Sequence, residues 1–200
     1  VKKQSYVFTD RGGDEITLRP ELTPSLARMI AQKQGELVFP ARWWSFGPFW
    51  RYEKMQRGRS REFFQWNIDM LGVSSAEADA ELVAIAAAFL KAVGLSPEKA
   101  CILVNNRRLM DAEFAALNIL PKNKGDVAGL VDRRDKMEQT AWEAYAGEIG
   151  LTARQLDGLK ELLADSERWR KSEELGRLFS TLESLGAVEY VRFDPNIMRG

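Results

Sequence analysis

Residues 42–71 read RWWSFGPFWRYEKMQRGRSREFFQWNIDML, and this stretch decides the fold. Two runs rich in aromatic residues enclose a basic segment from Lys54 to Ser60, a pattern typical of two antiparallel strands joined by a loop. Side chains alternate between the two faces of a strand. One face of the returning strand therefore carries Phe63, Gln65, Asn67 and Asp69. The stretch predicts a central hairpin with a polar inner face.

That inner face carries polar groups where a packed sheet would carry Val or Ile. Alternation places Arg51 and Glu53 on the same side as Phe49, at the end of the first strand, and Gln65 and Asp69 on the second. Burying such groups without partners costs roughly 1–3 kcal/mol each. A polar ligand is the simplest way to satisfy them, so the hairpin is a candidate binding site.

The loop between the strands is basic and flexible at Gly58. Its cations are Lys54, Arg57, Arg59 and Arg61. Arginine binds phosphate oxygens in a bidentate fashion, so this cluster suits a polyphosphate, and Phe63 and Phe64 offer flat faces for a base. From spacing alone, a solvated basic hairpin on an aromatic core fits equally well.

The segment before this hairpin predicts a second, shorter hairpin and a helix. Residues 6–9 and 15–18 flank the turn-forming sequence DRGG at 10–13. Thr23 is then in position to cap a helix, with Glu21 just before it at the strand-to-helix junction. On the residues alone, these two are a helix cap and a surface carboxylate.

The segment after the hairpin predicts a mixed helix and strand region. A helix is expected at 76–93, followed by a buried strand at 101–104 and a helix near 109–117. The core face of the first helix is predicted to be Leu82, Ile85, Ala86 and Phe89.

From about Pro121 to Leu185 the character changes to amphipathic helices. They are expected at 122–132, 134–149, 152–164 and 172–185. This pattern predicts an inserted helical subdomain, whose charged residues are typical of a solvated face. The chain then returns to a strand at 188–193.

The composition of the chain limits the kinds of site and partner that it can have. The chain has 200 residues, 45% of them hydrophobic, with 29 basic and 29 acidic residues, so any nucleic-acid contact must be local. A single cysteine and no histidine exclude an internal disulfide, a cysteine metal cluster and catalysis by Ser-His-Asp or Cys-His. Without an apolar run near eighteen residues or a signal peptide, we expect a cytoplasmic protein without a membrane contact.

Three segments resemble the histidyl-tRNA synthetases, a family of class II aminoacyl-tRNA synthetases. FWRYE at 49–53, the basic loop and GRSREFFQWNID at 58–69 resemble motif 2. TLRPELTPSLAR at 17–28 resembles the amino-acid-binding segment, and FDPNIMRG at 193–200 resembles the start of the histidine-specific signature. The resemblance implies an α+β fold, with an antiparallel sheet flanked by helices and an inserted helical subdomain.

The resemblance also implies a domain plan. Residues 1–120 would form part of the class II catalytic core, residues 121–186 the helical insertion, and residues 187–200 a return to the core. The first motif of the family and everything after the start of the histidine signature are not in this sequence. We therefore expect a piece of a longer synthetase that is weak or inactive alone.

By the same resemblance, the reaction is activation of L-histidine with ATP to histidyl-adenylate and transfer to tRNA(His). Arg51 would bind the α-phosphate of ATP and Glu53 the adenine amino edge. Arg59 would reach the distal phosphates, and Phe63 would stack on adenine. Mg²⁺ would be held mainly through the phosphates, with no metal ligand assigned on the protein.

The family pattern assigns the histidine site to a second set of residues. Glu21, Thr23 and Gln65 would hold the α-ammonium group, and Asp69 would accept a proton from the imidazole ring. Many relatives carry Glu where Asp69 stands, and some branches use Asp; the shorter side chain leaves open whether it contacts the ring. Arg199 would lie against the α-carboxylate and the α-phosphate, acting in catalysis together with Arg51.

The resemblance also implies further partners, and two other functional interpretations compete with it. The helical insertion would approach the acceptor stem of the tRNA, and the full-length protein would be a homodimer. A catalytically inactive paralogue, such as the histidine-sensing regulatory subunit of ATP phosphoribosyltransferase, predicts a degraded ATP site, yet Arg51 and Glu53 are present. A plain nucleic-acid-binding module leaves Glu21, Gln65 and Asp69 unexplained.

Overall fold

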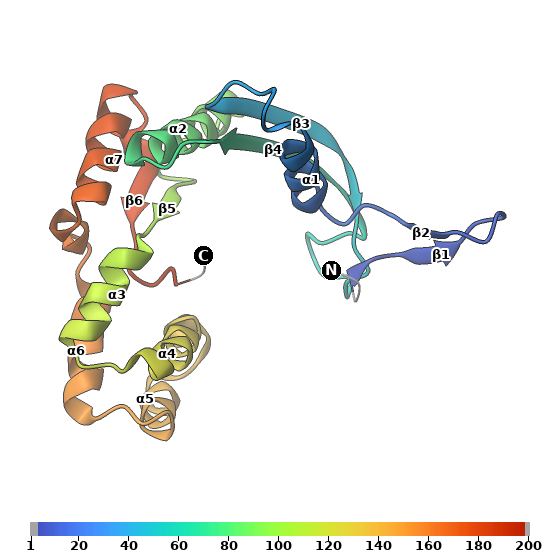
Figure 1. Cartoon of the computed structure of the whole chain (residues 1–200). Coiled ribbons are helices and arrows are strands. Elements are labelled where there is room, and N and C mark those ends of the chain that lie inside the picture. Colours follow the sequence, from blue (N-terminus) through green and yellow to red (C-terminus); the bar gives the residue numbers. More distant parts are fainter. Residues whose placement is uncertain (1–3, 199–200) are drawn as a thin grey trace. The chain divides into compact units, whose positions relative to one another are not determined.

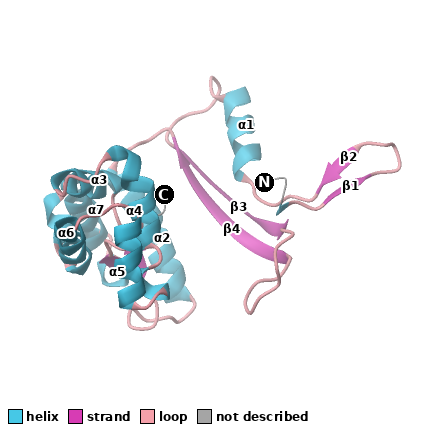
Figure 2. Ribbon diagram, turned by 90° about the horizontal axis from the view of Figure 1, so that it is seen from below, coloured by secondary structure: helices cyan, strands magenta, loops and turns pink. Residues whose placement is uncertain are grey.

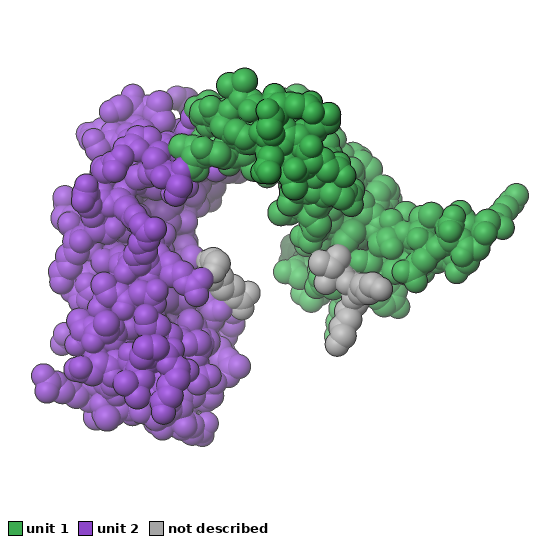
Figure 3. Space-filling model, in the orientation of Figure 1, with its two compact units in different colours: residues 1–73 green, residues 74–200 purple. Residues whose placement is uncertain are grey.

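The computed structural model describes residues 4–198, and the chain divides into two compact units. The first comprises residues 1–73 and the second residues 74–200 (Figures 1 and 3). The elements are helices and small sheets, an α+β composition that confirms the predicted fold class. No helix in the described part of the chain is long and apolar enough to cross a membrane.

The first unit contains two antiparallel hairpins and one helix. Strands β1 (Val7–Thr9) and β2 (Glu15–Thr17) pair around the predicted turn, and helix α1 (Thr23–Lys33) follows. The long hairpin consists of β3 (Ala41–Trp50) and β4 (Glu62–Leu71), as predicted (Figure 2).

The two faces of the long hairpin differ in exposure. The register pairs Phe49 with Phe63, Gly47 with Gln65 and Trp43 with Asp69, and this face is covered or half-buried. The opposite face leaves large aromatic side chains exposed: Trp44 (71%), Phe46 (66%), Phe64 (62%) and Trp66 (46%). Among the described residues of this unit, the hydrophobic side chains that are fully buried are those of Ala41 and Phe49. The unit therefore has little apolar core of its own.

The second unit has three apolar clusters among its described residues, the smallest of which contains Leu109, Leu175 and Phe193. Helix α2 (Ala76–Ala92) packs against α7 (Glu173–Ser184), and strands β5 (Ile102–Val104) and β6 (Val191–Phe193) pair in parallel beneath them. This first cluster includes Ala80, Ala87, Leu178, Leu182 and Val191.

The second cluster joins helix α3 (Arg107–Ala116) to the helical segment that follows it. That segment contains α4 (Lys124–Val131), α5 (Gln139–Glu148) and α6 (Ala153–Ala164), with 3-10 turns at 121–123, 134–136, 168–171 and 188–190. Trp142 lies at its centre and its ring N–H donates to the Leu130 carbonyl at 2.8 Å. The amphipathic pattern from 121 to 185 thus predicted helices correctly, although residues 134–149 divide into a 3-10 turn and α5.

Four expectations about local structure are wrong. The strand expected at 188–193 begins only at Val191, because residues 188–190 form a 3-10 turn. The core face of α2 is not Leu82, Ile85, Ala86 and Phe89, because Ala86 and Phe89 are exposed; Ala76, Ala80 and Ala87 are buried instead. The strand near Cys101 is not buried, since Leu103 is 44% exposed. Thr23 is the first residue of α1, after Leu22 at the cap position, and no side-chain hydrogen bond caps this helix.

Candidate functional site

A cleft opens at the loop end of the long hairpin, within the first unit. Its volume is ≈ 370 Å³, within the usual range for small-ligand sites. It is lined by Arg51, Glu53, Gly58, Arg59, Ser60 and Phe63. All four residues that the sequence assigns to ATP therefore line one cleft. Two guanidinium groups against one carboxylate leave it with an excess of positive charge, which suits an anionic ligand.

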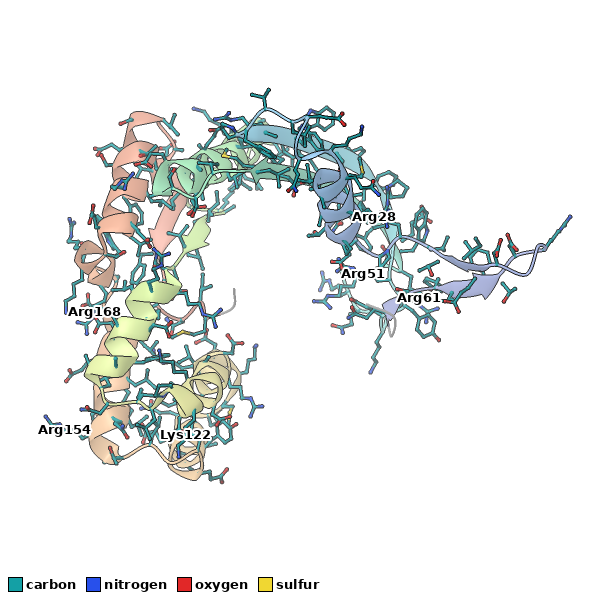
Figure 4. The ribbon with its side chains drawn as sticks, viewed as in Figure 1. Arg28, Arg51, Arg61, Lys122, Arg154 and Arg168 are labelled. Carbon is teal, nitrogen blue, oxygen red and sulfur yellow. The ribbon has the colours of Figure 1, made fainter. Side chains whose placement is uncertain are left out.

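Arg51 follows directly after β3 and is held on two sides. Its Nε donates to the Pro20 carbonyl at 2.9 Å, and its guanidinium carbon lies 5.1 Å from the centre of the Phe63 ring. Its backbone N–H donates to the Arg61 carbonyl at 2.9 Å, which closes the loop end of the hairpin. Figure 4 labels both residues. One nitrogen is thus committed to the protein, and the remaining guanidinium N–H groups extend along the aromatic wall of the cleft.

Glu53 and Arg59 face each other across the loop. Arg59 Nη1 lies 3.4 Å from Glu53 Oε2, with the Glu53 side chain 27% exposed and that of Arg59 66% exposed. A tight turn sets Arg59 in place, because its N–H donates to the Gln56 carbonyl at 2.9 Å and Gly58 takes a positive φ of 77°. The pair is long and partly solvated, so a ligand can replace it at small cost.

The residues assigned to histidine lie along the same face. Gln65 and Asp69 are half-buried on β4, two and six residues beyond Phe63, so their side chains point to the side that carries Phe63. Glu21 and Thr23 lie on the segment that leads into α1, next to Pro20. Since Arg51 Nε donates to the Pro20 carbonyl, this segment is connected to the cleft at the loop end of the hairpin.

Arg199 lies outside the described residues, so its predicted role remains a prediction. The structure brings together Arg51, Glu53, Arg59 and Phe63, places Gln65 and Asp69 on the same face, and links Glu21 and Thr23 to them through Pro20. In residues 4–198, no cluster of three or more Asp, Glu, Cys or His could hold a metal ion.

Sequence reasoning missed two residues next to the site. Arg19 donates from Nη2 to the Pro48 carbonyl at 2.8 Å, and its guanidinium carbon lies 4.4 Å from the centre of the Phe49 ring. Gly47 lies beside it, and a Cβ there would come within 3.0 Å of Arg19 Nη2. A glycine inside a long strand was a signal of such a close approach.

A protein-family model described as histidyl-tRNA synthetase matches residues 1–200. The chain is 32% identical over 212 residues to the chloroplastic/mitochondrial histidine–tRNA ligase of Arabidopsis thaliana. It is 37% identical over 190 residues to the histidine–tRNA ligase of Natronomonas pharaonis. These alignments cover 100% and 94% of this chain, but 43% and 44% of the relatives. The chain thus spans about half the length of the curated relatives it matches.

Two solved structures share the fold. Histidyl-tRNA synthetase from Nostoc sp. PCC 7120 gives a TM-score of 0.82 at 21% identity, covering 98% of this chain and 49% of that one. A protein from Bacillus halodurans, described as an ATP phosphoribosyltransferase regulatory subunit/histidyl-tRNA synthetase, gives 0.74 at 22% identity, covering 99% and 54%. At these identities the likeness concerns the fold alone.

Proposed function

The chain belongs to the histidyl-tRNA synthetase family, and on this premise we propose that it carries the substrate-binding hairpin of a histidine–tRNA ligase. The ligase would activate L-histidine with ATP to histidyl-adenylate and transfer the histidyl group to tRNA(His). The observation that carries the proposal is the single cleft lined by Arg51, Glu53, Arg59 and Phe63.

The ATP half of the site would act by positioning and charge neutralisation. Arg51 would direct its free N–H groups to the α-phosphate, where negative charge rearranges as the histidine carboxylate attacks in line. Arg59 would leave Glu53 for the distal phosphates, and Glu53 would then accept from the adenine amino group. Phe63 would stack on the base once Arg51 moves off its ring.

Mg²⁺ would accompany the nucleotide. Glu53, the carboxylate that lines the cleft, would be occupied by the adenine amino group, so the ion would be held mainly by phosphate oxygens. It would neutralise charge on the phosphates, while Arg51 and Arg59 bind them from the protein side.

The amino-acid half would lie deeper along the hairpin. Glu21, Gln65 and the Thr23 hydroxyl would accept hydrogen bonds from the α-ammonium group. The Thr23 hydroxyl makes no helix-capping hydrogen bond that would compete. Asp69 would accept the imidazole N–H and fix the tautomer of the ring. A site built around such a hydrogen bond rejects analogues that lack the donor. Arg199 would complete the site at the α-carboxylate.

The remaining organisation is proposed from the family. Residues 121–186 would be the insertion that approaches the acceptor stem of tRNA, with residues 1–120 and 187–200 in the catalytic core. Arg133 and Arg134, which lie 4.9 and 5.9 Å from the ring centres of Tyr145 and Trp142, are suited to phosphate contact there. The full-length protein would be a cytoplasmic homodimer, and these 200 residues alone would be weak or inactive.

A regulatory subunit of ATP phosphoribosyltransferase is the second candidate. The solved structure from Bacillus halodurans carries that description beside the synthetase name. A subunit that only senses histidine has no need for the paired Arg59 and Glu53 or for Arg51 above Phe63. The intact cleft therefore favours the ligase.

Calorimetric titration of the longest natural form of this chain tests the proposal, first with L-histidine and then with ATP and Mg²⁺. We expect Arg51→Ala to lose chiefly ATP affinity and Asp69→Ala chiefly histidine affinity, each by about tenfold or more, the effect of one charged hydrogen bond. Arg11→Ala, at the tip of the short hairpin, is the matched control and should change neither.

The outcomes separate the candidates. Histidine binding without ATP binding would favour the regulatory subunit. Absence of both would mean that only the fold is shared.

A further inference from the structure

We propose that Arg19 is a positioning residue that holds the histidine-binding segment against the free edge of β3, with Gly47 leaving the space it needs. The inference rests on the proposed function, because it concerns the placement of Glu21 and Thr23. Arg19 itself has no assigned contact with a substrate. The contacts described below are all with other residues of the chain, and Arg19 lies two residues before Glu21.

The first contact is between backbones. The Trp50 N–H donates to the Arg19 carbonyl at 3.0 Å, on the edge of β3 that does not pair with β4. Residues two apart in a strand direct their backbone groups to the same edge, so Pro48 faces this edge as well. Pro48 has no N–H, and a regular third strand could not complete its ladder there.

The Arg19 side chain supplies a hydrogen bond that a third strand would otherwise supply. Its Nη2 donates to the Pro48 carbonyl at 2.8 Å, which satisfies the acceptor that backbone pairing leaves open. The same guanidinium lies 4.4 Å from the centre of the Phe49 ring, which is 1% exposed. Phe49 stacks on Phe63 with ring centres 6.3 Å apart, so Arg19 contacts the neighbour of the proposed adenine platform.

Gly47 makes this approach possible. It is buried, it pairs with Gln65 across the ladder, and a Cβ at this position would lie 3.0 Å from Arg19 Nη2. That distance is shorter than the usual contact of a methyl group, so an alanine would push the Arg19 guanidinium away by a few tenths of an ångström. Arg19 and Gly47 should therefore act as one unit.

The segment is then held at two successive residues. Arg19 binds β3, and the Pro20 carbonyl accepts from Arg51, the proposed α-phosphate ligand. Without the Arg19 side chain, the segment keeps the backbone hydrogen bond from Trp50 and the contact of Pro20 with Arg51, but it loses the hydrogen bond to Pro48. Glu21 and Thr23 would then be held less firmly. Because a shift of about 1 Å weakens a preorganised site strongly, histidine should suffer more than ATP.

The test is pyrophosphate exchange and calorimetry with the longest natural form of the chain, comparing wild type, Arg19→Met, Arg19→Lys and Gly47→Ala. We expect Arg19→Met to raise the KM for histidine about tenfold and to change the KM for ATP less than about threefold. Arg19→Lys, which keeps a donor, should recover part of the loss. Arg11→Ala is the matched arginine control.

The double variant sharpens the result. If Arg19 and Gly47 act as one unit, Gly47→Ala added to Arg19→Met should cost little more than Arg19→Met alone. Equal losses of affinity for histidine and for ATP, or full additivity of the Arg19→Met and Gly47→Ala effects, would overturn the inference while the proposed function stands. If wild type binds neither ligand, the proposed function fails and the inference fails with it.

Discussion

At the scale of single residues, the cleft shows how one arginine can serve two sets of neighbours. Arg51 donates to the Pro20 carbonyl and lies over the Phe63 ring, so it connects the segment before α1 to the aromatic wall of the cleft. The Glu53–Arg59 pair, at 3.4 Å and partly solvated, fixes the loop only weakly. An Arg51 held at Nε by the Pro20 carbonyl and a replaceable Glu53–Arg59 pair suit a site that must admit a polyphosphate.

A second residue-scale feature is the ion pair between Glu77 on α2 and Arg177 on α7. Arg177 Nε and Nη2 donate to the two Glu77 carboxylate oxygens at 2.9 and 2.8 Å. The pKa of Glu77 is lowered from its ordinary value of 4.5, first by a hydrogen bond with the backbone of residue 77 and then by the Arg177 guanidinium. A carboxylate with a lowered pKa stabilises the folded state above its unfolded pKa.

This stabilisation should disappear as the pH falls through the lowered pKa of Glu77. We predict that Glu77→Gln melts below wild type at neutral pH, and that the difference closes in acid, below the ordinary value of 4.5. Circular-dichroism melts over a pH series would measure this. Glu183→Gln, an exposed glutamate of α7, is the control and should not show the trend. A gap that stays constant in acid would contradict the assignment.

At the scale of elements, the start of α6 is fixed by a capping box. The Gln155 N–H donates to the Thr152 hydroxyl at 3.3 Å, and the Gln155 side chain accepts from the Thr152 N–H at 3.0 Å. The same Gln155 side chain donates to the Asn118 carbonyl at 2.9 Å, just after the end of α3. One box therefore both starts a helix and connects it to its neighbour.

We predict that Thr152→Ala lowers the free energy of unfolding by about 1 kcal/mol, the usual cost of a lost N-cap. Urea denaturation followed by circular dichroism would measure it. Thr181→Ala is the matched control, because the Thr181 hydroxyl donates to the Arg177 carbonyl within α7 and caps nothing. Its expected effect is within about 0.5 kcal/mol. Equal losses of unfolding free energy in Thr152→Ala and Thr181→Ala would argue against a stabilising role of the capping box.

At the scale of the whole molecule, the two units differ in what stabilises them. In its described part, the unit of residues 74–200 buries three clusters of Leu, Val, Ala and aromatic side chains. In the described part of residues 1–73, Ala41 and Phe49 are the fully buried hydrophobics, and one face of the long hairpin exposes four aromatic rings. A two-stranded hairpin with so little buried surface is marginally stable on its own.

We therefore predict that residues 74–200, expressed alone, unfold cooperatively in urea, and that residues 1–73 alone do not. Dispersion of amide signals in NMR spectra would give a second measure of the same difference. Cooperative unfolding of residues 1–73 by themselves would show that the hairpin contributes more to the stability of this unit than its buried surface indicates.

The hairpins and most helix positions could be predicted from the residues alone, and the resemblance to the family selected four residues that line one cleft. The hairpins follow from period-two alternation and turn chemistry, which are local properties of the chain. Arg51, Glu53, Arg59 and Phe63 line one cleft because antiparallel pairing brings the two ends of the same loop together. Histidine binding and the role of Arg199 stay predictions.

Only the tertiary structure decided which faces are buried and how the segments are joined. Helix α2 is apolar nearly all around, so periodicity could not select a face, and contact with Leu178 and Leu182 of α7 selected Ala80 and Ala87. The contact of Arg19 with Pro48 joins residues 29 positions apart. No local pattern specifies such a contact, because its free energy depends on groups that only the folded chain brings together.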